Sequence, residues 1–148
     1  MKFRILTSLL VSFLLVSCSA KWANQLAKHQ STLSKTASSN IPIEQKLDSL
    51  LISFAEMMHQ SLDRLNPKTG VKYVQSYAET NQQSILVILD QLNQKAKDME
   101  KAEKISLGLN LLTKPYAKDF KELLPRFQRK YAQYKFCLLY TSPSPRDS

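Results

Sequence analysis

Two side chains at a spacing suited to metal binding stand near the middle of the chain, Glu56 and His59. The pattern Glu-x-x-His places a carboxylate and an imidazole on adjacent turns of a helix, and a two-metal centre in a helical bundle uses two such pairs with two further glutamates. This sequence holds one pair. On a helix whose apolar side is centred on Phe54, Glu56 and His59 point about 160° and 140° away from that side. The pattern therefore predicts solvent-facing side chains and no metal.

The other motifs that could carry chemistry are few. Gly70 and Gly108 are the only glycines, so the chain has neither a glycine-rich phosphate loop nor a Gly-x-Ser-x-Gly nucleophile turn. Met57 and Met58 stand beside His59, as a copper site would require. Helical phase sends the methionines to the apolar side and the histidine away from it, so we expect both methionines to fill gaps in a core.

A histidine and carboxylates that meet in a cleft would indicate an enzyme. His29 lies in a segment that we expect to be a tether, which leaves His59 as the one histidine of the folded domain. The phase of His59 predicts that it does not converge with carboxylates. The sequence therefore predicts a protein that is not an enzyme and has no bound cofactor.

The first residues have the layout of an export signal. Lys2 and Arg4 precede an uncharged apolar run over residues 5–16. This run is shorter than the roughly 20 residues that a membrane-spanning helix needs. It ends in Leu15-Val16-Ser17-Cys18, which resembles the lipobox of bacterial lipoproteins. The resemblance covers only this leader, and it marks residues 1–17 as a signal peptide.

The resemblance implies a covalent lipid anchor. A signal peptidase would cut between Ser17 and Cys18, a diacylglycerol would be joined to the Cys18 sulfur, and an acyl chain to the new amine. Two or three chains on one residue are enough for stable membrane attachment, which a single chain is not. Because Ser19 and not aspartate follows Cys18, the resemblance favours the outer membrane, facing the periplasm, over the inner membrane.

The last twelve residues, CLLYTSPSPRDS, differ in character from the chain before them. One choice of codons for residues 137–147 gives DNA that resembles a transposase adapter used in sequencing libraries. We therefore interpret residues 137–148 as translated adapter sequence and expect the helical domain to be truncated near Phe136. With Cys18 lipidated and Cys137 derived from adapter, no disulfide is expected.

Composition and periodicity predict an all-α fold. Two glycines in 148 residues argue against many short strands, and a hydrophobic fraction of 43% excludes a disordered chain. We expect one domain, a small antiparallel bundle of three to four amphipathic helices over residues 42–136. Residues 18–41, rich in small polar residues, are expected to be the lipidated cysteine and a tether. The helical spacing of Trp22, Leu26, His29 and Leu33 also allows a short or transient helix there, with Trp22 suited to a membrane interface.

Four helices are expected within the domain. Apolar stripes mark residues 42–65, 71–103, 104–113 and 115–136. An interruption of the second near Thr80 is left open, and its apolar run over residues 85–89 indicates a well-buried central helix. Gly108 is expected where another helix approaches closely, and Pro125 is expected to kink or split the last helix.

Positive charge is concentrated near the end of the domain. The net charge is +9 for the whole chain; without the leader it is +7, and residues 114–135 contribute +5 of that. The residues expected to contact a partner or an anionic membrane surface are Lys118, Lys121, Arg126, Arg129 and Lys130. An envelope location argues against nucleic acid as the partner.

Two functions follow as hypotheses. In the first, the protein is a lipid-anchored interaction module whose basic face meets an envelope protein or anionic lipid. In the second, it is a periplasmic carrier that sequesters a lipid or other apolar ligand between helices, with residues 85–89 lining the cavity. A large pocket would favour the carrier, and a closed core would exclude it.

Overall fold

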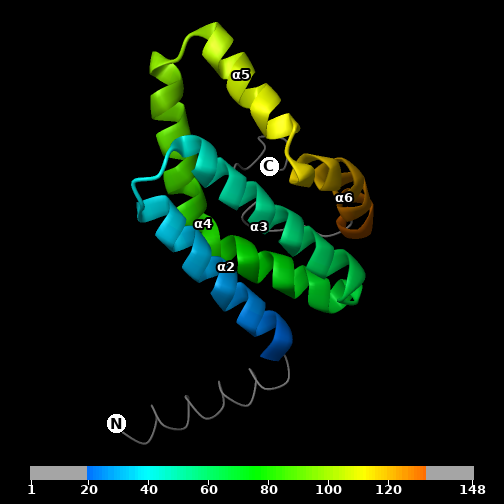
Figure 1. The fold of residues 1–148 in the computed structure, drawn as a ribbon. Helices are drawn as coiled ribbons and strands as arrows, with labels where there is room; N and C mark the ends of the chain where they lie inside the picture. Colours follow the sequence, from blue (N-terminus) through cyan, green and yellow to red (C-terminus); the bar gives the residue numbers. More distant parts are fainter. Residues whose placement is uncertain (1–19, 133–148) are drawn as a thin grey trace, which may run out of the picture.

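A computed structural model describes residues 20–132 as a set of five helices (Figure 1). In chain order they are α2 (Ala20–Ser38), α3 (Ile43–Asp63), α4 (Pro67–Asp98), α5 (Lys101–Leu112) and α6 (Pro115–Tyr131). No strand occurs between residues 20 and 132. The predicted all-α bundle is confirmed, with one helix more than the four expected.

The additional helix is α2, and it corrects the prediction that residues 18–41 hold a tether, since residues 20–38 of that segment form a packed helix. It packs against α4 and α3, with Leu33 fully buried and Ala37 6% exposed. Trp22 meets Tyr73 of α4 edge to face, with ring centroids 6.1 Å apart, and so contributes to protein packing. The polar composition of this segment was misleading because one narrow stripe of larger side chains is enough to bury a helix.

The junction between α3 and α4 follows from local chemistry. The side chain of Asn66 accepts a hydrogen bond of 2.9 Å from the backbone N–H of Thr69, and Pro67 is the first residue of α4. Asparagine caps an exposed N–H well, and proline has no N–H to leave unpaired at that position. The Asn-Pro pair therefore both ends α3 and begins α4 four residues earlier than expected.

The core lies between α2, α3 and α4. The predicted stripe of α3 is confirmed, since Leu47, Leu50 and Met58 are buried. They meet Tyr73, Tyr77 and Ile88 of α4, which are 0–2% exposed. In Figure 1 the long α4 crosses both α2 and α3. It is continuous through Thr80, where an interruption had been left open.

Gly70 and not Gly108 marks the close approach of two helices. A Cβ at Gly70 would overlap the hydroxyl of Tyr131 in α6, whereas a Cβ at Gly108 would have nothing within 4 Å. Tyr131 also donates a 2.7 Å hydrogen bond to the Ser61 carbonyl of α3. The expectation for Gly108 is wrong because α5 has no buried residue and lies mainly against α6, so that no other helix comes close to Gly108. Pro125 lies inside α6 without splitting it.

Candidate functional site

The residues of the predicted lipid anchor, Ser17 and Cys18, lie outside the described residues, as do residues 137–148. The anchor, the cleavage position and the adapter interpretation therefore stay predictions. The five basic residues predicted to contact a partner or a membrane all fall within α6 and can be placed individually.

Lys130 has a structural role in addition to its charge. Its Nζ reaches the C-terminal end of α3 and donates to the carbonyl oxygens of Ser61, Leu62 and Leu65 at 2.7, 3.1 and 2.9 Å. Burial lowers the pKa of Lys130, while the charge of nearby Asp63 opposes this and that of Arg126 adds to it. Because all three donors of the amine are used on α3 and the turn that follows it, Lys130 is removed from the predicted contact surface.

Arg126 is also engaged within the molecule. Its Nη2 lies 2.9 Å from Oδ1 of Asp63 in α3. The hydrogen bond from His59 and then that from Arg126 hold the pKa of Asp63 below its usual value. Arg126 and Lys130 thus fasten α6 to α3, and the exposed cations that remain of the predicted five are Lys118, Lys121 and Arg129.

Lys118 and Lys121 belong to a surface where basic and apolar side chains alternate, which we call the α5–α6 corner. It is a shallow depression of about 770 Å³, and its relevant members are Leu112, Lys114, Lys118, Lys121 and Leu124. Leu112 is 72% exposed and Leu124 is 43% exposed. Such large apolar side chains beside lysines are unusual for a surface that meets only water, and they suit an interface between water and lipid.

A second hollow, the apolar groove, adjoins this corner. It has a volume of about 560 Å³ and lies between α3, α4 and α6. Its lining is almost entirely apolar: Phe54, Met57, Met58, Val74, Tyr77, Ala78, Ile85, Leu86, Phe120, Leu124 and Phe127, with Gln82 and Gln128. Phe120 and Leu124 line both the apolar groove and the α5–α6 corner.

The groove changes the interpretation of residues 85–89. Ile88 is fully buried, but Leu86 is 52% exposed and Leu89 45% exposed. The expectation that this whole run is well buried is therefore wrong, because only one side of α4 packs on α2 and α3, and Leu86 and Leu89 lie at other angles around the helix than Ile88. Ile85 and Leu86 line the groove, as the carrier hypothesis expected of this run.

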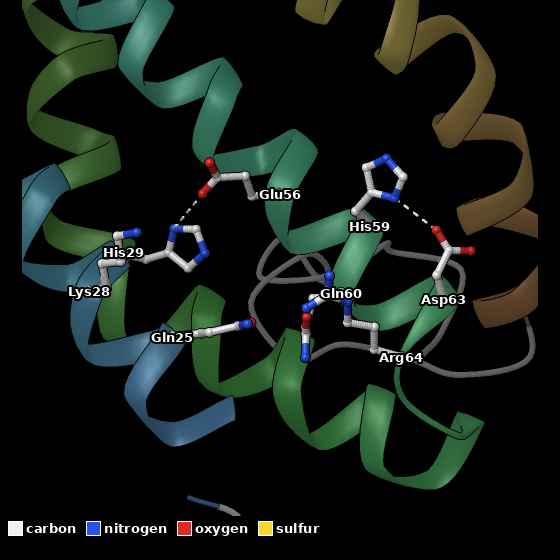
Figure 2. Close-up of a pocket in the computed structure, with 8 residues that line it drawn as sticks. All are labelled: Gln25, Lys28, His29, Glu56, His59, Gln60, Asp63 and Arg64. Atoms are coloured by element: carbon white, nitrogen blue, oxygen red, sulfur yellow. Dashed lines mark hydrogen bonds and ion pairs between the residues drawn. The ribbon is translucent and has the colours of Figure 1, made fainter. Parts of the chain in front are cut away.

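A third hollow, the polar groove, lies between α2 and α3. It has a volume of about 550 Å³ and is lined by Gln25, Lys28 and His29 of α2 and by Glu56, His59, Gln60, Asp63 and Arg64 of α3 and its end. Figure 2 shows His29 and Glu56 facing one another, with His59 and Asp63 paired further along α3. The relevant distances are 4.0 Å between His29 Nδ1 and Glu56 Oε2, and 2.8 Å between His59 Nδ1 and Asp63 Oδ2.

This groove contradicts the expectation that histidine and carboxylates would not meet. Glu56 and His59 do face solvent, with side chains 61% and 57% exposed, as helical phase predicted. The error concerned both histidines: His59 pairs with Asp63, one turn further along α3, and His29 belongs to a packed helix and not to a tether. His29 is 7% exposed, and burial lowers its pKa, against the opposing charge of Glu56 and with the smaller effect of Lys28.

Behind His29 lies a chain of buried hydrogen bonds. His29 Nδ1 is 2.9 Å from Ser53 Oγ, which is 2.6 Å from Tyr77 Oη. Burial also raises the pKa of Tyr77. Ser53 is 4% exposed and does not line the polar groove, so this hydroxyl cannot meet a substrate there. We interpret the chain as a means of satisfying polar groups where α2, α3 and α4 meet.

Several titratable groups of the polar groove are already paired within the molecule. Asp63 is already engaged by His59 and Arg126. Among residues 20–132, no three His, Cys, Asp or Glu side chains gather closely enough to hold a metal ion. The absence of enzymatic activity stays a prediction.

No helix in the described part of the chain combines the length and apolar character needed to cross a membrane. Comparison with family models, with curated proteins and with solved structures finds no match to this chain.

Proposed function

We propose that this protein is a lipid-anchored envelope protein that acts as a helical binding module, with its basic face on an anionic membrane surface. The observation that carries the proposal is the α5–α6 corner. There Lys118 and Lys121 are exposed beside the exposed side chains of Leu112 and Leu124. Amphipathic surfaces of this kind place apolar groups at the acyl boundary and cations among anionic head groups.

The location rests on the leader. The lipobox-like run Leu15-Val16-Ser17-Cys18 supports a diacylglycerol and an acyl chain on Cys18 and an anchor in the outer membrane, facing the periplasm. An anchored domain needs only a weak second contact to lie against the bilayer, because the anchor keeps the local concentration of lipid high. No further cofactor is part of the proposal.

The anchor is tested by growing bacteria that express the full chain with an alkyne-bearing palmitate. We expect the wild-type protein to be labelled, Cys18→Ala to be unlabelled, and Cys137→Ala to be labelled like the wild type. Label that persists in Cys18→Ala would overturn the anchor. The Cys137→Ala variant controls for acylation of the other cysteine.

The basic face is tested on the full lipid-anchored chain in two kinds of vesicle. One contains phosphatidylcholine alone, and the other contains a third of phosphatidylglycerol. We expect amide hydrogen exchange over residues 109–124 to slow only on the anionic vesicles, because the α5–α6 corner is then covered by lipid. Lys118→Glu with Lys121→Glu should abolish this protection.

The matched control is Lys68→Glu with Lys72→Glu, which makes the same change in net charge at two exposed positions near the start of α4. It should retain the protection. Equal exchange on both vesicles in the wild-type protein would refute membrane contact. Protection that appears only when an extract of envelope proteins is added would replace the lipid surface with a protein partner.

A further inference from the structure

The apolar groove poses a question that membrane contact does not answer. Its lining contains no charged side chain, and its rim carries Leu86 on one side and Leu124 on the other, 52% and 43% exposed. Exposed apolar side chains around an apolar hollow reduce solubility, and they are typical of surfaces that a ligand covers. The groove is also of a size typical of sites for small molecules, roughly 300–1,000 Å³.

Two exposed cations lie beside the groove where it meets the α5–α6 corner. Phe120 and Leu124 line both the apolar groove and the α5–α6 corner, and the corner brings Lys118 and Lys121 to this part of the groove. An occupant that matches this arrangement is apolar along its length and negatively charged at one end. We propose that the apolar groove binds one acyl chain of an anionic amphiphile, with its acidic head group held by Lys118 and Lys121.

The lining favours a flexible chain over a rigid ligand. Met57 and Met58 line the groove together with Phe54 and Tyr77, and methionine side chains adapt their shape at little cost. The two polar members, Gln82 and Gln128, are both exposed, so they can turn to water when an acyl chain is present.

This inference goes beyond the proposed membrane contact and does not depend on it. It is tested with the full chain in vesicles of uncharged phosphatidylcholine, where the proposed contact is absent. The probe is a trace of hexadecanoic acid with a diazirine on its chain, and the comparison probe is the matching alcohol. After irradiation, peptide mass spectrometry locates the adducts.

We expect the acid to label residues 54–58, 82–86 and 120–128, and to label them more than the alcohol does. Ala78→Trp places a large ring in the groove and should reduce this labelling by about tenfold, equivalent to about 1.4 kcal/mol. Its matched control is Ala102→Trp on an exposed position of α5, which should leave labelling unchanged. Leu86→Glu alters only the exposed rim, so it should fold and also reduce labelling.

The role of Lys118 and Lys121 in holding the head group is tested with separate variants. Lys118→Gln with Lys121→Gln should remove the preference for the acid over the alcohol, whereas Lys68→Gln with Lys72→Gln should keep it. Adducts confined to Leu109 and Leu112 of α5 would overturn the proposal, because they would indicate contact with the bilayer surface alone. It would also be overturned if a chain ending at Ala132 were labelled when the full chain is not, because residues 133–148 would then occupy the groove. Adducts that appear only with crosslinked dimers would overturn it in favour of a second copy.

Discussion

The packed end of the molecule, α2–α4, and its open end, α5, use apolar residues in opposite ways. The buried core comes mainly from α2, α3 and α4, where Leu33, Tyr73 and Ile88 are fully covered. In α5 no residue is buried, and Ile105, Leu109 and Leu112 are 53%, 59% and 72% exposed. The comparison separates residues that hold the fold together from residues that the fold leaves available for binding.

Helix α6 has one side that is fastened to the packed end and one side that lies beside α5. On one side Lys130 and Tyr131 fasten it to α3, and on the other Lys118 and Lys121 lie at the α5–α6 corner. The side of the helix on which a lysine lies therefore decides whether it holds helices together or is free to contact a ligand. Substitutions that are chemically alike should have unlike effects on the two sides.

The largest difference is expected between two leucines. Leu33→Ala should lower the free energy of unfolding by about 2–5 kcal/mol, because it opens a cavity between α2 and α4. Leu112→Ala should change it by no more than about 0.5 kcal/mol, because this side chain is already in water. Urea denaturation followed by circular dichroism measures both.

The same pair decides whether residues 20–38 are a tether. A leucine in a tether has no packing to lose, so an unchanged midpoint for Leu33→Ala would restore that interpretation. If Leu112→Ala also reduced the protection of residues 109–124 on anionic vesicles without affecting stability, the difference between the packed end and the open end would be sharper.

The next effect concerns the attachment of α6. Lys130→Met keeps the length of the side chain but removes the donor from three carbonyl groups at the end of α3, which should cost about 1–3 kcal/mol. Lys121→Met, on the exposed side of the same helix, should leave the unfolding midpoint nearly unchanged. Equal midpoints for the two variants would mean that the amine of Lys130 does not fasten the helices.

Sequence periodicity was sufficient for much of the fold. The apolar stripe of α3 and the start of α6 at Pro115 could be predicted because nearest neighbours along a helix determine them. Residues 20–38 could not, because small polar residues carry little signal. Their burial depends on Tyr73 and Tyr77 of α4, which contact Trp22 and His29 from far along the chain.

The candidate sites were less accessible from the sequence. Periodicity could show that Lys118 and Lys130 are basic and lie on α6, but not that one faces water and the other reaches Ser61, 69 residues earlier. Likewise, the phase of Glu56 was correct, while its neighbour His29 comes from a helix that was not expected to pack. Contacts between helices depend on tertiary geometry, which a single amphipathic pattern does not encode.

Substitution of the two glycines by alanine should change the stability in opposite directions. Gly70→Ala should lower stability by about 1–3 kcal/mol, because the new methyl group would displace the Tyr131 hydroxyl and weaken its bond to Ser61. Gly108→Ala should raise stability by about 0.5–1 kcal/mol, because alanine favours a helix and meets no neighbour in α5. Thermal denaturation of both variants gives the signs, and a gain at Gly70 would show that α6 does not rest on this position.

The smallest effect is a pH dependence confined to the packed end. Burial lowers the pKa of His29 in the folded protein from its ordinary value of 6.5. Between the two pKa values the unfolded chain binds more protons than the folded one, so the free energy of unfolding falls as the pH is lowered through about 6.5 and levels off below the folded pKa. Urea midpoints between pH 7.5 and pH 5 should show this slope.

His29→Gln keeps a polar group beside Ser53 but cannot be protonated, so this variant should lose that part of the slope. The control is His59→Gln, which alters an exposed histidine and leaves His29 in place, so the slope should persist. An undiminished slope in His29→Gln would assign the pH dependence to other groups. Loss of the slope in His29→Gln alone would place it at the junction of α2, α3 and α4, the end of the molecule where polar groups as well as apolar ones are buried.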